Sequence, residues 1–503
     1  MKKRASLRTI STSVLLRDAA LAALGGVALA LAFPKFDAVW LAPFGTAALF
    51  FAWKGASWNR AFWLGWFGGA IFFGITFSWF GYTAGSYLGA LAPILVIGPA
   101  LIEGFFFAVA GMATAIAFAR APAWAAPLAA AAAFTAADWL RSIGPIGAPF
   151  AQLGYTQAQT PLAIFAAYIG TYGITFVLCA VGAYLADAIA RRTATPLATT
   201  VGAIVLAWIA CFAWWPARHA AAPTMRVAAV QGNIRQSLKF QPGQVAAGID
   251  RYVRMTRTLR TFRPQLIVWP ETVVAEPLNE DYATVASLQR LAGTLRTTLV
   301  VGAQDTSDRR WHNAIYVFGA AGSPPSLYYK RALVPFAETV PLPSVLGYLP
   351  YVKSMGGNFA AGRVDAVFPT GRLRFAPLIC WESAFADLAY AQVRAGAQLL
   401  VVSTDDAWFG DTAGPYQHAQ IAQLRAIENG VWVVRAAATG ISGIIAPDGR
   451  YVARGALDTQ TIVTGMVGSP PGSPFAHFGP TPVALALAAL YFVLVVPRWR
   501  RVA

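Results

Sequence analysis

The chain has 503 residues, of which 57% are hydrophobic and 12% are charged, whereas soluble domains average about 45–50% and about 25%. These values exclude an ordinary soluble protein and indicate a membrane protein. The formal net charge of +17 does not indicate a nucleic-acid partner, because much of it lies in short segments beside apolar runs, where Lys and Arg fix the orientation of a membrane protein.

The acidic residues divide the chain into two parts. Five of the 22 precede residue 223 and the other 17 follow it. The first part is therefore a series of apolar segments, and the second has the composition of a globular domain. Of the three cysteines, Cys179 and Cys211 lie in apolar runs, which leaves Cys380 as the one thiol of the polar part. This distribution excludes a disulfide framework.

Eight apolar segments approach the ~20 residues that a helix needs to cross the hydrocarbon core. We predict them at residues 17–33, 38–53, 61–80, 91–119, 123–140, 162–188, 197–215 and 481–497. Pro34 separates the first two, which are short and also fit a hairpin that does not fully cross. A cleaved signal peptide is the alternative for the first, because Ala28-Leu29-Ala30 resembles a cleavage site.

Charge alternates between the segments that connect these spans. Residues 1–8, 54–60, 120, 191–192 and 498–501 are basic, whereas residues 81–89 and 143–160 carry no charge. The positive-inside rule therefore places both termini in the cytoplasm and the polar part on the far side of the membrane. We predict a bundle of seven spans over residues 1–222, a globular domain over 223–470, and a linker, eighth span and basic tail over 471–503.

Three charged residues lie within the predicted bundle near its uncharged loops. Glu103 is a carboxylate deep in a span, where such residues are functional by default. The alternative is a structural pair with a polar or basic side chain on a neighbouring helix. Asp138 and Arg141 are three residues apart at a helix end, which favours a local ion pair.

Short β-branched runs that end in polar turns begin after residue 223, and several alternate with helical stretches. We predict strands at 226–231, 266–269, 299–303, 314–318, 327–329, 373–379, 399–403, 431–436, 443–445 and 461–467, and helices at 244–262, 282–295, 384–395 and 416–429. Buried strands that alternate with helices predict a layered α/β sandwich.

Three ionisable residues stand where apolar strands end, which is where catalytic groups gather in α/β folds. Glu271 follows Leu-Ile-Val-Trp-Pro, Lys330 follows Ser-Leu-Tyr-Tyr, and Cys380 follows Phe-Ala-Pro-Leu-Ile and precedes a helix. A strand–cysteine–helix junction exposes the thiol and can direct backbone N–H groups at it. Such groups lower a thiol pKa and bind an oxyanion.

The segments around these three residues resemble the Glu-Lys-Cys triad of the nitrilase superfamily, in the same order. Together with the flanking spans, they make the chain similar to the apolipoprotein N-acyltransferase family. Further matches are Val230-Gln231-Gly-Asn-Ile, Lys330-Arg-x-Leu-Val-Pro-Phe336-x-Glu338, Asp406-Ala-Trp408-Phe-Gly-Asp, Gln417-His418, Pro447-Asp448-Gly, Asp138-Trp-Leu-Arg141 and Gly154-Tyr-x-Gln157. The resemblance implies a four-layer αββα sandwich and a bacterial inner-membrane protein with a periplasmic catalytic domain.

The chain departs from the family pattern at three positions. Phe240 stands where Trp is usual, Trp381 where Tyr is usual, and Asp405 where Asn is common. Each change keeps an aromatic or polar character. The departures therefore bear on the fit of the lipid donor rather than on the class of reaction.

The resemblance also implies a mechanism without a cofactor or metal. Cys380 attacks the ester carbonyl of a phospholipid, and the resulting thioester passes its acyl group to the N-terminal amine of a diacylglyceryl-modified apolipoprotein. Glu271 is then the general base. Lys330, with a backbone N–H near Trp381, stabilises the oxyanion.

Several further residues are expected to support this chemistry. Glu338 would orient Lys330, and Glu382 would orient Glu271 or the incoming amine; the alternative for both is a solvated surface carboxylate. Aromatic side chains near the membrane favour a lipid substrate, although a core role is the alternative for each. They are Phe240, Phe336, Tyr348, Tyr351, Trp381 and Trp408.

Other functions use parts of the same pattern. A membrane-tethered amidase or nitrile hydrolase would need the same triad with water at the thioester. A transporter has little support, because intramembrane ionisable residues are few. A Cys-His dyad with His312 or His418 is an alternative, and no base placement favours either. Asp405-Asp406 as a metal site lacks accompanying His or Cys ligands.

Overall fold

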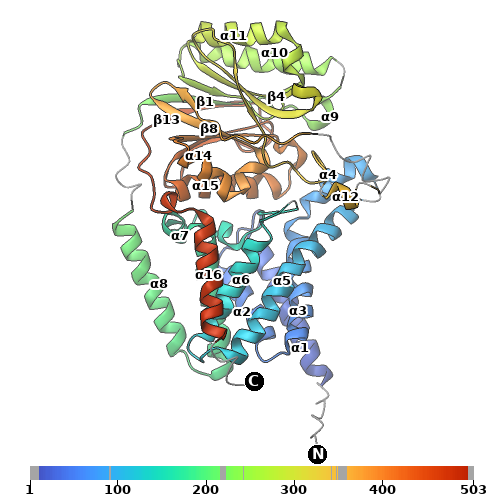
Figure 1. Ribbon diagram of the computed structural model, residues 1–503, viewed down its shortest axis with the longest axis vertical. Helices are drawn as coiled ribbons and strands as arrows, with labels where there is room; N and C mark the ends of the chain where they lie inside the picture. Colours follow the sequence, from blue (N-terminus) through green and yellow to red (C-terminus); the bar gives the residue numbers. More distant parts are fainter. Residues whose placement is uncertain are drawn as a thin grey trace, which may run out of the picture.

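The computed structural model describes residues 11–496 except residues 90–91, 145, 216–221, 242, 341, 347 and 349–358. An α-helical bundle forms one end of the molecule and an α/β domain forms the other (Figure 1). The apolar and polar parts of the sequence therefore fold as two packed units.

The bundle contains the helices that precede the α/β domain and one that follows it. They are α1 (Thr12–Leu31), α2 (Leu41–Trp53), α3 (Trp58–Thr76), α4 (Trp79–Leu88), α5 (Ile94–Arg120), α6 (Ala126–Leu140), α7 (Ala166–Arg191), α8 (Thr195–Ala213) and α16 (Pro480–Val495). Each predicted span overlaps one of these helices. Within the part of the chain that the structure describes, four helical segments are long and apolar enough to cross a membrane: Thr12–Leu31, Val96–Arg120, Pro161–Arg191 and Thr195–Ala213. Three shorter apolar helices are α2, α6 and α16, so the number of crossings stays a prediction.

The predicted span at 61–80 is wrong at its end, because helix α3 stops at Thr76 and α4 begins at Trp79. The Trp79 indole donates a hydrogen bond to Gln417 of the α/β domain, and Gln417 donates one to the Thr76 carbonyl. These contacts join the two units at the break. Sequence periodicity does not report such a tertiary contact.

Glycines bring α3 against its neighbours. A Cβ on Gly65 would lie 2.3 Å from the Phe107 carbonyl oxygen of α5. One on Gly26 of α1 would lie 2.3 Å from the Gly68 carbonyl oxygen of α3. Small residues allow helix backbones to approach this closely. The resulting van der Waals contacts stabilise helix association in a bilayer.

The α/β domain contains two sheets. The first combines the strands of the first half of the domain with the last strand, and the second takes all its strands from the second half. The first comprises β1 (Met225–Gln231), β2 (Leu266–Val268), β3 (Val274–Pro277), β4 (Thr298–Asp305), β5 (His312–Phe318), β6 (Ser326–Tyr329) and β13 (Thr461–Val467). Its order is β13-β1-β2-β4-β5-β6, with β3 paired to β4. The second comprises β7 (Phe368–Thr370), β8 (Leu373–Ile379), β9 (Leu399–Thr404), β10 (Trp432–Ala437), β11 (Gly443–Ile445) and β12 (Tyr451–Arg454). Its order is β12-β11-β10-β9-β8-β7.

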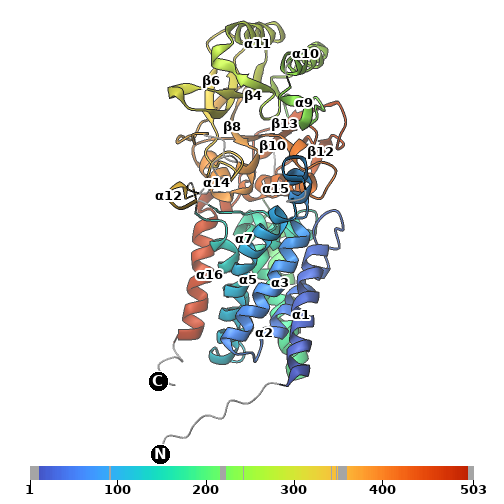
Figure 2. The ribbon, with the colours of Figure 1, turned by 90° about the vertical axis from the view of Figure 1, so that its right-hand side faces the viewer.

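Helices cover the outer face of each sheet, so the domain has four layers. Helices α10 (Gln244–Arg257) and α11 (Tyr282–Leu295) cover the first sheet. Helices α14 (Ala386–Arg394) and α15 (Gly414–Asn429) cover the second and lie between it and the bundle (Figures 1 and 2). The predicted sandwich is observed, and all ten predicted strands overlap observed ones. Strands β3, β7 and β12 were not predicted, because they are short and carry few buried apolar residues.

The bundle and the α/β domain share a continuous core. Leu424 of α15 and Trp381 pack in the same cluster as Phe134 of α6. Glu428 of α15 accepts hydrogen bonds from the backbone N–H (2.8 Å) and hydroxyl (2.5 Å) of Thr171 in α7. The α/β domain is therefore packed directly onto the helical bundle.

Three charged residues of the bundle, Glu103, Asp138 and Arg141, form a buried cluster. Arg141 Nε donates to Asp138 at 2.7 Å, as predicted for a local pair. The same guanidinium lies 3.5 Å from Glu103, which supports the structural interpretation of Glu103. Arg141 also donates to the Ala148 carbonyl at 2.5 Å, and so fixes the loop that lies between α6 and the α/β domain.

Candidate active site

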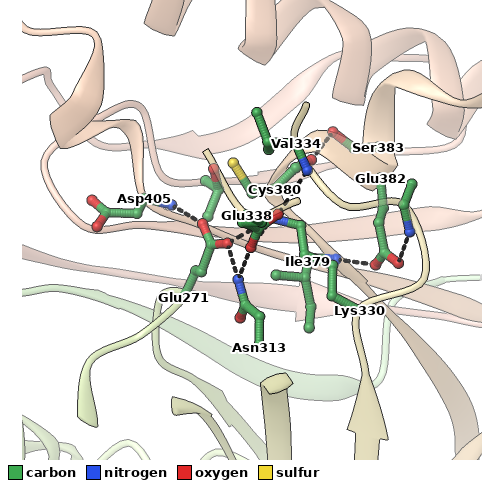
Figure 3. A network of polar contacts seen from close by, with 12 residues as sticks. Glu271, Asn313, Lys330, Val334, Glu338, Ile379, Cys380, Glu382, Ser383 and Asp405 are labelled. Carbon is green, nitrogen blue, oxygen red and sulfur yellow. Dashed lines mark hydrogen bonds and ion pairs between the residues drawn. The ribbon is translucent and has the colours of Figure 1, made fainter. Parts of the chain in front are cut away.

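Strand ends position the three residues that the sequence predicted to be catalytic. Glu271 lies three residues beyond β2, and Lys330 directly follows β6. Cys380 follows β8 and begins the 3₁₀ turn Cys380–Ala384. Its φ of +50° is uncommon for a residue with a side chain and stores backbone strain. The three residues follow strands of both sheets, and their side chains lie close together (Figure 3).

A network of hydrogen bonds joins Glu271 to Lys330 and to a second carboxylate. Lys330 Nζ lies 3.0 Å from Glu271 Oε1 and 3.0 Å from Glu338 Oε2. The Asn313 side-chain amide donates to Oε1 of both carboxylates at 2.7 Å. Val334 N–H donates to Glu338 at 2.8 Å. Glu338 therefore contacts Lys330, in agreement with its predicted place, and is not a solvated surface group.

Neighbouring charges favour the charged forms of Glu271 and Lys330, whereas burial favours the neutral form of Cys380. Burial raises the pKa of Glu271, but the adjacent Lys330 ammonium outweighs it, and the net pKa is lowered. Burial lowers the pKa of Lys330, yet the carboxylates of Glu271 and Glu338 raise it above its usual value. Burial, followed by the charge of Glu271, raises the pKa of the Cys380 thiol, and Lys330 opposes this only in part. The resting site therefore holds a carboxylate, an ammonium and a neutral thiol.

Glu382 does not contact Glu271, which is one of the two groups that the sequence predicts it to orient; the other is the incoming amine. It is fully buried and accepts hydrogen bonds from Tyr328 Oη (2.9 Å) and from the N–H groups of Arg331 (2.5 Å) and Ile379 (2.6 Å). None of these partners is Glu271. Glu382 therefore links, through hydrogen bonds, the N–H group of the residue before Cys380 and that of the residue after Lys330. Burial raises its pKa to about 7.

The predicted aromatic residues fall into two groups. Trp381 is buried and stacks on Phe150 of the bundle, with ring centroids 4.8 Å apart. Phe240 is 51% exposed, and Phe336 and Trp408 are partly exposed. Tyr348 is exposed, whereas Tyr351 lies outside the described residues.

Neither histidine is placed as a base for the thiol. His418 Nε2 lies 2.8 Å from Ser383 Oγ and 3.1 Å from the Cys380 carbonyl oxygen, so it contacts the backbone of the nucleophile. His312 Nδ1 lies 3.0 Å from the Ala360 carbonyl oxygen. Asp406 pairs with His418 and with the Arg435 guanidinium, at 2.9 and 2.6 Å. The polar atoms of His418 and Asp406, on which the dyad and metal interpretations depend, are therefore already bound by other side chains.

Sequence reasoning missed two residues of the network, Asn313 and Lys239. Asn313 is the second residue of the buried strand β5, where a polar side chain is itself a signal. Lys239 follows Gln-Ser-Leu in the short helix α9 (Gln236–Lys239) and is buried. It pairs with Asp405 and donates to the Glu271 carbonyl at 3.1 Å.

Known proteins match the chain over both of its units. Residues 25–184 match the family of the apolipoprotein N-acyltransferase N-terminal domain, and residues 226–468 match the carbon-nitrogen hydrolase family. The apolipoprotein N-acyltransferase of Pseudomonas paraeruginosa is 33% identical over 95% of this chain and 96% of that protein. That of Azotobacter vinelandii is 34% identical over 96% of each.

Among solved structures, Nit3 of Saccharomyces cerevisiae, a nitrilase-superfamily member, is 20% identical and covers 49% of this chain and 91% of its own, with a TM-score of 0.39. The full-length relatives share both the membrane part and the catalytic part with this chain. Their identity exceeds 30% over nearly the whole of each protein. The chain belongs to the apolipoprotein N-acyltransferase family.

Proposed function

We propose that this protein transfers a fatty acyl chain from a phospholipid to the N-terminal amine of a diacylglyceryl-modified apolipoprotein, through a thioester on Cys380. One observation carries the proposal: the neutral Cys380 thiol stands beside the Glu271–Lys330 pair in a domain whose core continues into a membrane bundle. A thiol at this position lies in a domain that packs on the membrane helices, so we expect its substrates to be lipids held in the bilayer.

In the first half-reaction, Glu271 takes the proton of the Cys380 thiol as the sulfur attacks the ester carbonyl carbon. Oε2 is the acceptor, because Oε1 already binds Lys330 and Asn313. The oxyanion is stabilised by the Lys330 ammonium and a backbone N–H at Trp381. The carbon–oxygen bond then breaks, and Glu271 returns the proton to the leaving glycerol oxygen, so that a lysophospholipid departs.

In the second half-reaction, the N-terminal amine of the acceptor attacks the thioester carbon. Glu271 takes a proton from the amine, and Lys330 again faces the oxyanion. The carbon–sulfur bond breaks, the proton returns to the Cys380 sulfur, and an amide is formed. The free enzyme is thereby regenerated without a cofactor.

The exposed aromatic residues beside the triad supply an apolar surface for the acyl chain. Phe240 directly follows Lys239, which binds the Glu271 carbonyl, and Phe336 lies two residues before Glu338. Both are therefore attached to segments that contact the triad. Trp408 lies where the catalytic domain meets α4, since its carbonyl accepts a hydrogen bond from the Thr83 hydroxyl at 2.7 Å.

The topology belongs to the same proposal. Residues 1–222 form seven spans, 223–470 the periplasmic catalytic domain, and 471–503 the linker, eighth span and cytoplasmic tail of an inner-membrane protein. Helix α1 begins and α16 ends at the end of the bundle that is remote from the α/β domain (Figures 1 and 2). This arrangement supports two cytoplasmic termini and a catalytic domain on the opposite side.

Intact-mass measurement of the purified protein with and without phospholipid tests the proposal. The wild type is expected to gain one acyl group, which neutral hydroxylamine removes, and Cys380→Ala is expected to gain none. Addition of a diacylglyceryl-cysteine peptide should discharge the adduct into an amide. An adduct that water discharges equally fast would favour the membrane-tethered amidase instead. A hydroxylamine-labile adduct on Cys380→Ala would exclude Cys380 as the nucleophile.

A further inference from the structure

The backbone and the second carboxylate oxygen of Glu271 are held by a buried ion pair from two other segments. Lys239 Nζ, at the end of α9, donates to the Glu271 carbonyl oxygen at 3.1 Å and pairs with the Asp405 carboxylate. The backbone N–H of Asp405 donates to Glu271 Oε2 at 3.0 Å. Side-chain exposure is 8% for Lys239 and 3% for Asp405.

These contacts complement those of Lys330. Lys330 and Asn313 occupy Glu271 Oε1, and the described structure gives Oε2 one donor, the N–H of Asp405. Oε2 therefore keeps a lone pair for the thiol proton. The direction of that lone pair depends on where the 405 backbone lies, and the Asp405 side chain fixes that backbone through Lys239 and the Ala407 N–H at 3.2 Å.

We propose that Lys239 and Asp405 are positioning residues that form a charge-neutral clamp on the general base Glu271. This inference deepens the proposed function and rests on it. The clamp holds the base on the side opposite to Lys330 and leaves Oε2 directed at Cys380. Neither residue takes or gives a proton in the reaction.

Charge neutrality matters because Glu271 already faces several charged or titratable groups. Lys330 lies at the end of β6, Glu338 lies in the loop that follows it, and Cys380 begins the 3₁₀ turn after β8. An unpaired Lys239 ammonium would further favour the carboxylate and weaken the base. An unpaired Asp405 carboxylate would repel it and favour its protonated form. The pair avoids both effects.

The rate of Cys380 alkylation should fall at low pH as Glu271 becomes protonated, and this part of the pH profile is its acid limb. Removal of the negative charge and removal of the positive charge of the pair should therefore shift the acid limb in opposite directions. Asp405→Asn leaves the ammonium uncompensated, which lowers the pKa of Glu271 and shifts the limb to lower pH. Lys239→Met leaves the carboxylate uncompensated, which raises the pKa of Glu271 and shifts the limb to higher pH. Each shift should be on the order of one pH unit. The double variant Lys239→Met/Asp405→Asn restores neutrality and should return the limb to within a few tenths of a unit of the wild type.

The experiment measures iodoacetamide alkylation of Cys380 across a pH series in the full-length protein, with peptide mass analysis to assign the modified cysteine. The Lys54–Asp187 ion pair of the bundle, at 2.5 Å, supplies the matched control. Lys54→Met and Asp187→Asn remove the same charges remote from Cys380 and should leave the limb unchanged. Circular dichroism confirms that each variant is folded.

Shifts of the same sign in the two single variants, a double variant whose limb stays displaced from that of the wild type, or slower alkylation without any shift would overturn the clamp. Lys239→Gln and Asp405→Ser provide a second pair if the first variants unfold, because they remove the same charges with polar replacements. Alkylation needs no lipid, so its result is separate from the proposed function. If the wild type forms no acyl adduct while the opposite shifts are observed, the acyl-transfer proposal fails and the clamp remains.

Discussion

The ring of Phe150 stacks on the indole of Trp381, with planes 13° apart and centroids 4.8 Å apart. Phe150 belongs to the loop after α6, and Trp381 directly follows the nucleophile. Arg141, which pairs with Glu103 and Asp138, binds the same loop at Ala148. A continuous set of contacts therefore links the charged cluster of the bundle to the backbone at Cys380.

Phe150→Ala should lower both stability and acylation rate. Removal of a buried Phe usually costs about 3–5 kcal/mol, and the loss of the stack frees the Trp381 ring beside the oxyanion site. We expect a lower unfolding temperature and at least a tenfold slower single-turnover acylation. Phe134→Ala, which removes another buried ring of the bundle, is the control and should lower stability alone. Equal rate losses in the two variants would show that the Phe150–Trp381 contact has no specific role.

Glu271 and Lys330 should respond differently to pH when each is replaced. Glu271→Gln removes a general base, which costs about 10²–10⁴-fold in rate. Lys330→Met removes oxyanion stabilisation, which costs about 10²–10³-fold. Alkaline pH generates thiolate without a base, so it should partly rescue acylation in Glu271→Gln. It supplies no cation and should leave Lys330→Met slow.

Single-turnover acylation between neutral and mildly alkaline pH measures this difference, and circular dichroism confirms folding. Lys330 also opposes the raised pKa of the Cys380 thiol, so a small pH dependence is expected in its variant. Rescue of Lys330→Met alone would reverse the two roles. Wild-type rates in both variants would exclude the triad.

Glu382 should make stability depend on pH. Its pKa in the folded state is about 7, against an ordinary value of 4.5, chiefly because of burial. The folded state therefore binds more protons than the unfolded state between these values, and stability falls as pH rises through this range. At about 1.4 kcal/mol per unit, the loss reaches about 3 kcal/mol.

The unfolding temperature of the wild type should accordingly fall more steeply from pH 5 to pH 8 than that of Glu382→Gln, which does not titrate. The variant should also be less stable at pH 5, because its amide nitrogen faces the N–H donors of Ile379 or Arg331. Parallel pH profiles for the two proteins would show that Glu382 does not titrate in this range.

The proposed topology predicts that cysteines introduced at two exposed positions differ in their reaction with a membrane-impermeant thiol reagent. Asp308 and Ser57 are both exposed, but Asp308 lies in the catalytic domain and Ser57 in a basic loop of the bundle. In a background without native cysteines, Asp308→Cys should react with a membrane-impermeant thiol reagent in intact spheroplasts, whereas Ser57→Cys should react only after lysis. Equal labelling before lysis would contradict the eight-span arrangement.

The sequence by itself determined the elements that local pattern controls. Glu271, Lys330 and Cys380 each stand out because an apolar or aromatic run typical of a strand ends just before them, and such runs are recognised from composition and alternation alone. The helices of the bundle follow from apolar segment length, and the charges between them predict their orientation. The same local reasoning predicted the ion pair of Asp138 with Arg141, which are three residues apart.

Only the tertiary structure decided which distant side chains meet. Lys239 and Asp405 are 166 positions apart, and no periodicity of either segment reports that they pair beside Glu271. The sequence predicts that Glu382 orients Glu271 or the incoming amine, yet packing surrounds it with the backbone N–H groups of Arg331 and Ile379. Phe150 reads as one more apolar residue of the bundle until it stacks on Trp381. Local pattern fixes where a strand or helix lies, whereas the partner of a buried polar or aromatic side chain depends on how separate elements pack.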